Sequence, residues 1–113
     1  MANAIKNYNG QLGGQPGQTA IGLAQWHARD MNSHDYVGLV GSDGVGFLQR
    51  WACSGGAPQD GGVIAVGQSS DVNAVLNFLK SDPSANKVLT LGGSANTRVA
   101  VGYANGFWLI IVY

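Results

Sequence analysis

The stretch "FWLIIVY" (107–113) constrains the fold more than any other part of the sequence. A strand with one solvent-exposed face alternates apolar and polar side chains, but here neither alternate set carries a charge. One set is Phe107, Leu109, Ile111 and Tyr113, and the other is Trp108, Ile110 and Val112. Such a strand needs cover on both faces, so we expect it to be the central strand of a sheet between two helical layers. Removing it is expected to abolish folding.

A second strand is predicted immediately before it. Residues 97–104 ("TRVAVGYA") are joined to the last stretch by Asn105-Gly106, and both turn residues tolerate the positive φ of a type I′ turn. This dipeptide is the strongest short-range signal of a β-hairpin. The apolar run "VIAVG" (63–67) has the length of a third strand.

Helical spacing recurs in three places. The first helix is expected to follow Thr19 as N-cap, with the apolar positions Ile21, Ala24, Ala28 and Met31. The second follows the glycine-rich stretch 37–46, is capped by Ser42 or Asp43, and has the apolar positions Phe47, Leu48, Trp51 and Ala52. The third starts at Ser69, Ser70 or Asp71, ends before Pro83, and has the buried stripe Val72, Val75, Leu76 and Leu79.

These elements predict an α/β (α+β) fold: a three-layer α/β/α sandwich with a small, mainly antiparallel central sheet and a C-terminal β-hairpin. Residues 1–18 are rich in Gly, Gln and Asn, with a short helical turn predicted around Ile5. We expect them to form an N-terminal lead-in segment, and residues 19–113 to form a single domain.

The chain carries little charge. Of its 113 residues, 11% are charged, less than half of the usual share of about 25%, and the six basic and six acidic side chains cancel. Nucleic-acid binding is not expected, because it needs a basic patch that releases counterions. No stretch approaches the roughly 18 apolar residues of a membrane span. A surface poor in charge favours an extracellular or assembled protein.

The single cysteine, Cys53, excludes an intrachain disulfide and a zinc site of the CxxC type. We expect it to be a small buried apolar residue. The aromatic residues Trp26, Trp51, Phe78 and Trp108 are predicted to belong to the core. The N-terminal stretch has neither an apolar run nor a basic lead of a signal peptide. Either the chain stays inside the cell or a signal has been removed before Met1.

The order of these elements resembles a known family. The helix "LAQWHARDM" is followed by His34, by Arg50 before Gly55, and by the strand "GGVIAVG". The helix "VNAVLNFLKSDPSANKVL" and the hairpin "RVAVGYANGFWLIIVY" complete the order. Together, residues 19–113 resemble the CAP superfamily (cysteine-rich secretory, antigen 5 and pathogenesis-related proteins), also called SCP-like. The resemblance implies an α/β/α sandwich, secretion, and non-enzymatic binding of lipids, sterols, partner proteins or cell-surface components.

Some members of this family bind a divalent metal in a central cleft through two histidines and one or two acidic residues. The first cleft histidine matches His34, but the second corresponds to Ser84 and the cleft glutamate to Gly62. Asp60 is close enough in sequence to replace the missing acid. Even so, we expect neither a metal nor another cofactor. Tyr36 is expected to line the cleft with His34.

His27, the other histidine, lies beside the apolar face of its helix. We expect it to be a packed residue with one hydrogen-bonded nitrogen and not a ligand. Ser, His and Asp side chains are all present, but no GxSxG elbow accompanies them, and we expect no enzyme.

Three functions follow. We expect an extracellular, non-enzymatic CAP-like module that binds a lipid-like small apolar ligand or a protein partner. Its cleft is expected around His34 and the loops 36–46 and 58–61. The alternative is a structural subunit that self-assembles into a homo-oligomer, as in an extracellular appendage or a viral or phage particle, which low charge favours. A distant alternative is a small hydrolase that uses His34.

Overall fold

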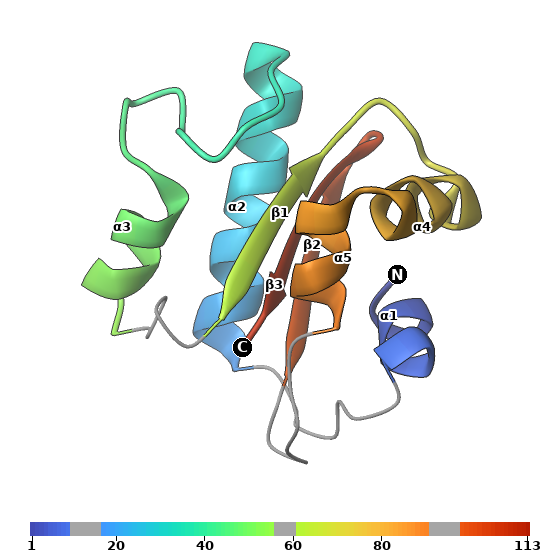
Figure 1. Cartoon of the computed structure of the whole chain (residues 1–113). Coiled ribbons are helices and arrows are strands. Elements are labelled where there is room, and N and C mark those ends of the chain that lie inside the picture. Colours follow the sequence, from blue (N-terminus) through green and yellow to red (C-terminus); the bar gives the residue numbers. More distant parts are fainter. Residues whose placement is uncertain (10–16, 56–60, 91–97) are drawn as a thin grey trace.

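The computed structural model describes residues 1–9, 17–55, 61–90 and 98–113 (Figure 1). Five helices and three strands lie in this part of the chain. In chain order they are α1 (Ala2–Asn9), α2 (Gln18–His34), α3 (Phe47–Cys53), β1 (Gly62–Val66), α4 (Val72–Ser81), α5 (Pro83–Leu89), β2 (Val99–Ala104) and β3 (Phe107–Val112). None of the described helices is both long and apolar enough to cross a membrane.

The strands form one antiparallel sheet in the order β1-β3-β2, so the C-terminal strand is central as predicted. The hairpin between β2 and β3 turns at Asn105 and Gly106, whose φ angles are 46° and 89°. Both values are positive, as a type I′ turn requires. All six residues of β3 are buried.

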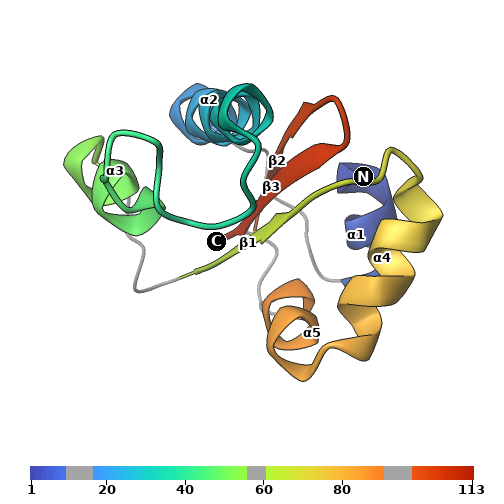
Figure 2. The same ribbon diagram turned by 90° about the horizontal axis from the view of Figure 1, so that it is seen from above.

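Helices cover both faces of the sheet, which confirms the predicted α/β/α sandwich (Figure 2). On one face, α2 and α3 pack over Leu109 and Ile111 with Phe47 and Trp51. On the other, α1, α4 and α5 enclose a second apolar cluster, which contains Ile5, Leu76, Leu79, Leu89, Trp108 and Ile110. Because β3 contributes alternate side chains to each cluster, it joins the two cores.

Helix α2 lies unusually close to β2. A Cβ atom added to Gly102 would lie 2.1 Å from the carbonyl oxygen of Ala24, so only glycine permits this approach. One residue further along each element, the side-chain amide of Gln25 accepts a hydrogen bond from the Tyr103 backbone N–H (3.2 Å) and donates one to its C=O (2.8 Å). Gln25 therefore caps the outer edge of β2 at Tyr103.

The helix boundaries differ from the predictions in two places. Helix α2 begins one residue before Thr19, with Gly17 as N-cap. Helix α3 is preceded by Gly46 and has no side-chain cap, because the carboxylate of Asp43 and the hydroxyl of Ser42 make other bonds. Both predicted caps were therefore wrong.

Helix α4 follows the prediction more closely. Asp71 caps it through the backbone N–H groups of Asn73 and Ala74, and the helix ends at Ser81. Pro83 does more than stop it, since this residue is the first of α5, which Asp82 caps in turn.

The start of the chain is part of the packed structure. Ile5 on α1 is fully buried among residues of α4, α5 and the sheet, and the Tyr8 hydroxyl donates a 2.5 Å hydrogen bond to the Asn86 side chain. A helix around Ile5 is thus confirmed. The boundary between a lead-in segment and a domain at residue 19 stays a prediction.

Three residues expected to be buried are exposed. Cys53 at the end of α3 is exposed, and the side chains of Trp26 and Phe78 are 41% and 60% exposed. Trp26 instead stacks against the guanidinium of Arg50, whose Cζ lies 4.2 Å from the ring centroid. Phe78 lies on the outer side of the α4 stripe, where Val75, Leu76 and Leu79 already fill the contact with the sheet.

Candidate binding groove

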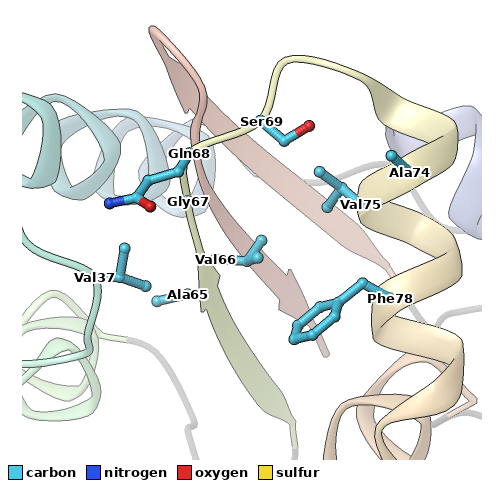
Figure 3. Close-up of a pocket in the computed structure, with 9 residues that line it drawn as sticks. All are labelled: Val37, Ala65, Val66, Gly67, Gln68, Ser69, Ala74, Val75 and Phe78. Atoms are coloured by element: carbon cyan, nitrogen blue, oxygen red, sulfur yellow. The ribbon is translucent and has the colours of Figure 1, made fainter.

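A groove follows β1, with the segment 37–39 on one side and α4 and α5 on the other (Figure 3). It consists of two adjoining hollows of about 500 and 350 Å³ that share Val37 and Ala65. The larger hollow is lined by Val37, Ala65, Val66, Gly67, Gln68, Ser69, Ala74, Val75 and Phe78. The smaller is lined by Val37, Gly38, Leu39, Val63, Ile64, Ala65, Asp82, Ser84, Ala85 and Val88. We call these two hollows together the β1 groove.

The walls of the β1 groove present exposed apolar side chains. Phe78 extends from α4 toward β1, and Val37 lies on the opposite side of the strand (Figure 3). Their side chains are 60% and 48% exposed. Gly67 allows Val37 to approach the end of β1, since a Cβ at this glycine would lie 2.7 Å from the Val37 Cγ2 atom. Apolar groups gathered in a hollow are typical of a binding site.

His27 on α2 anchors the segment 37–39, which forms one wall of the groove. The Nε2 atom of this buried histidine lies 2.7 Å from the Gly38 carbonyl oxygen, to which it donates. Its ring packs edge-on against Phe47 and Tyr36, at centroid distances of 5.4 and 6.0 Å. The Nδ1 atom has no hydrogen-bond partner within the described ranges. A packed histidine with one hydrogen-bonded nitrogen is therefore confirmed.

Asp30 anchors the next part of the same segment. Its buried carboxylate accepts hydrogen bonds from the Tyr36 hydroxyl (2.5 Å), the Ser42 backbone N–H (2.8 Å) and the Ser42 hydroxyl (2.6 Å). The Nδ1 atom of His34, one helical turn away, lies 3.2 Å from the same carboxylate. Four groups thus surround one carboxylate and hold the segment 36–42 against α2.

These contacts change the acidity of both partners. Burial alone would raise the pKa of Asp30, but the hydrogen bonds from Ser42 and Tyr36, together with the nearby His34, lower this pKa to about 2. Burial and the hydrogen bond to Asp30 raise the pKa of the Tyr36 hydroxyl well above its usual range. At neutral pH, Asp30 is therefore a charged acceptor and Tyr36 a neutral donor.

An ion pair between Arg50 and Asp43 holds the loop that joins α2 to α3. Arg50 donates a 2.6 Å hydrogen bond to Asp43, whose carboxylate also accepts from the Val45 backbone N–H. This hydrogen bond from Arg50 lowers the pKa of Asp43. Since Arg50 also stacks on Trp26, α2, α3 and the segment between them are joined at this point.

The residues predicted for the cleft fall into two groups. Ser84 lines the smaller hollow, and Gly62 begins β1, which forms the floor of the groove. His34 and Tyr36 instead meet at Asp30, and neither is among the residues that line the two hollows. Asp60 lies outside the described residues.

Two important residues of this region were not predicted from the sequence. Asp30 precedes His34 by four residues, a spacing that brings side chains together on a helix, and this signal was available. Phe78 gave no such signal, because its position is compatible with the apolar stripe of α4. Within residues 1–9, 17–55, 61–90 and 98–113, no three His, Cys, Asp or Glu side chains are arranged to hold a metal ion.

Comparison with known proteins supports the fold. No protein-family model and no curated protein sequence matches the chain. A crystal structure of an extracellular protein containing an SCP domain, from Bacillus anthracis str. Ames, matches 98% of this chain with a TM-score of 0.75 and 20% sequence identity. The chain has an SCP-like fold.

This SCP-like fold confirms the resemblance noted in the sequence and shows that the chain is a divergent example. The chain spans 37% of the length of the Bacillus anthracis protein.

Proposed function

We propose that this SCP-like chain is a non-enzymatic binding module that holds an apolar ligand or protein segment in the β1 groove. The observation that carries the proposal is the pair of apolar side chains, Phe78 and Val37, that face the groove from opposite walls while remaining half exposed. Leaving such surface in water is unfavourable, by about 25 cal/mol for each Å². A ligand that covers both side chains would recover this free energy.

The polar residues of the region support a binding role more than a catalytic one. The carboxylate of Asp30 is surrounded by donors, and each donor holds part of the wall in place. We propose that His34 and Tyr36 act on binding indirectly, through the position of the segment 37–39. Ser84 and Gly62 belong to the groove directly, Ser84 by offering a hydroxyl beside α5.

We also propose that the protein works outside the cell. The surface is poor in charge, with 11% of the residues charged. The structural neighbour from Bacillus anthracis is described as an extracellular protein, which is consistent with this location.

Binding of a neutral apolar dye, Nile red, tests the proposal. The wild-type protein should bind the dye with an increase in fluorescence, and Phe78→Ser or Val37→Ser should weaken binding about tenfold, because each change removes much of one apolar wall. Leu48→Ser is the matched control, since Leu48 is 45% exposed and does not line either hollow.

Circular dichroism should show that all three variants remain folded. Equal dye affinity in the wild-type protein, Phe78→Ser and Val37→Ser would show that the groove is not the binding site.

A further inference from the structure

The hydrogen-bonding pattern of the sheet shows which backbone groups of β1 point into the groove. Arg98 and Tyr113 exchange two backbone hydrogen bonds, 2.5 and 2.9 Å long, at the open end of the hairpin. In an antiparallel pair, residues that exchange such bonds alternate with residues that do not. Residues 107, 109 and 111 of β3 therefore bond β2, and residues 108, 110 and 112 turn their backbone groups toward β1.

The register of β1 on β3 then fixes the outer edge. Gly62, Ile64 and Val66 lie opposite residues 112, 110 and 108, so these three bond β3. Val63 and Ala65 turn their N–H and C=O groups away from the sheet, and both residues line the groove. Within the part of the chain that the structure describes, no hydrogen bond outside the sheet reaches the backbone of either residue.

The two edges of the sheet differ at one position. Val99, Val101 and Tyr103 face outward on β2, and at Tyr103 the Gln25 amide bonds both backbone groups. On β1, the outward-facing N–H and C=O groups of Val63 and Ala65 have no such partner among the described residues, so a ligand in the groove can bond them. Unpaired edges are usually blocked, because they can pair with another chain. An unpaired strand edge inside an apolar groove can therefore pair with the backbone of another chain.

The walls decide what kind of backbone can reach this edge. Val37 and Leu39 rise on one side of β1, and Phe78 and Val88 on the other. A second folded copy would carry the same two walls around its own β1, which would keep the two edges apart. A single extended chain fits between the walls. A lipid would cover the apolar side chains but leave the N–H and C=O groups of Val63 and Ala65 unbonded.

We propose that an extended peptide segment of a partner protein binds as a fourth strand along the outer edge of β1, pairing with the backbone of Val63 and Ala65. This inference rests on the proposed function, because it names the ligand of the same groove. The backbone bonds set the register, and alternate side chains of the peptide lie against the segment 37–39 and against α4 and α5.

The charge of the groove indicates the composition of the peptide. Asp82 is the one charged residue among the described lining residues, and it lies at the α5 end. The Oδ1 atom caps α5 by accepting from Ser84 and Ala85. The carboxylate favours a Lys or Arg at this end of the peptide and apolar residues near Phe78.

A selected peptide provides the probe. Random linear peptides of about ten residues, enough to pair with a short strand, are displayed on phage and selected on the full chain, and the tightest binder that Nile red displaces is synthesised. Amide hydrogen exchange is then followed by NMR. The peptide should slow exchange at Val63 and Ala65 by about tenfold or more, since each gains a hydrogen bond. Exchange at Ile64, already bonded to β3, should not change.

Two variants separate backbone pairing from apolar contact. Ala65→Pro removes the outward N–H, a change that edge strands tolerate, and should weaken peptide binding about tenfold compared with Ala65→Val. Ala65→Val adds the same number of carbon atoms but keeps the N–H. The two variants should bind Nile red with the same affinity as each other.

Several results would overturn the inference. One is a selection that yields no peptide displaced by the dye, or equal peptide affinity in Ala65→Pro and Ala65→Val. Another is slow exchange at Val63 and Ala65 without peptide in a protein that sediments as a dimer, which would assign the edge to a second copy. If the wild-type protein binds no Nile red at all, the proposed function itself fails.

Discussion

At the scale of single residues, Asp30 explains how the wall of the β1 groove is held. Four groups converge on its carboxylate: His34 at the end of α2, the Tyr36 hydroxyl, and the backbone N–H and hydroxyl of Ser42. Hydrogen bonds to a charged acceptor are about twice as strong as neutral ones. The residues around His34 first suggest metal or acid-base chemistry. Their geometry instead holds the segment 36–42, which includes the groove wall, against α2.

Replacing this carboxylate should cost stability. We expect Asp30→Asn to lower the free energy of unfolding by about 2 to 3 kcal/mol at pH 7, because the amide loses charge and turns a donor toward groups that already donate. Urea unfolding measures the change. Asp43→Asn is the control: the side chain of Asp43 is 45% exposed in its ion pair with Arg50, so its loss should cost clearly less stability than that of Asp30. Equal losses in the two variants would contradict the assigned role of Asp30.

The stability difference between the wild-type protein and Asp30→Asn should depend on pH. The pKa of Asp30 is lowered to about 2 in the folded protein, below the value of about 3.9 in an unfolded chain. The resulting stabilisation, about 2 kcal/mol, is present above about pH 4 and is lost as the pH falls toward 2. Urea unfolding should show the difference between the wild-type protein and Asp30→Asn shrinking across this window.

Predictions of which side chains are buried succeeded for some residues and failed for others. His27 was expected to pack with one bonded nitrogen, and it does. Phe78 and Cys53 were expected to be buried because of their apolar character, but helical spacing alone does not show where the partner surface ends. For Phe78, the sheet contact ends at its neighbours on α4, and the ring is left to the groove.

At the scale of elements, the contact between α2 and β2 depends on one glycine. A methyl group at Gly102 would lie 2.1 Å from the Ala24 carbonyl oxygen, so helix and strand would have to separate. We expect Gly102→Ala to lower the free energy of unfolding by about 2 to 3 kcal/mol, as other overpacked sites do. Thermal unfolding measures this.

Gly22, on the exposed face of the same helix, is the matched control. A Cβ there has no neighbour within 4 Å, so Gly22→Ala should leave stability unchanged or raise it by up to about 1 kcal/mol. A Gly102→Ala protein as stable as Gly22→Ala would show that the two elements can move apart without cost.

The sequence predicted which elements form better than where they begin. The two apolar faces of β3 and the Asn105-Gly106 turn were sufficient for the central strand and the hairpin. The starts of α2 and α3 were missed, because the side chains that suit a cap can be recruited by tertiary partners, as Ser42 is by Asp30. Helix α5 was missed although Asp82-Pro83 is a good start signal, since Pro83 also ends α4.

At the scale of the whole molecule, the sandwich followed from the sequence but the groove did not. A strand with two apolar faces requires two covering layers, whatever the details of the helices. The groove depends instead on how far α4 and the segment 37–39 stand from β1, a distance that no local pattern encodes. The edge of β1 was likewise invisible until the order β1-β3-β2 was known.

The contribution of α1 to this assembly is a further test at this scale. Ile5 is fully buried against the cluster formed by α4, α5 and the sheet, so Ile5→Ala should lower the free energy of unfolding by about 2 to 4 kcal/mol through the cavity that it leaves. Leu48→Ala, at a site 45% exposed, should change stability by less than about 0.5 kcal/mol. Urea unfolding of both variants decides between two views of residues 1–9. A large loss in Ile5→Ala makes α1 part of the folded unit, whereas a loss no greater than that of Leu48→Ala would make it a lead-in segment.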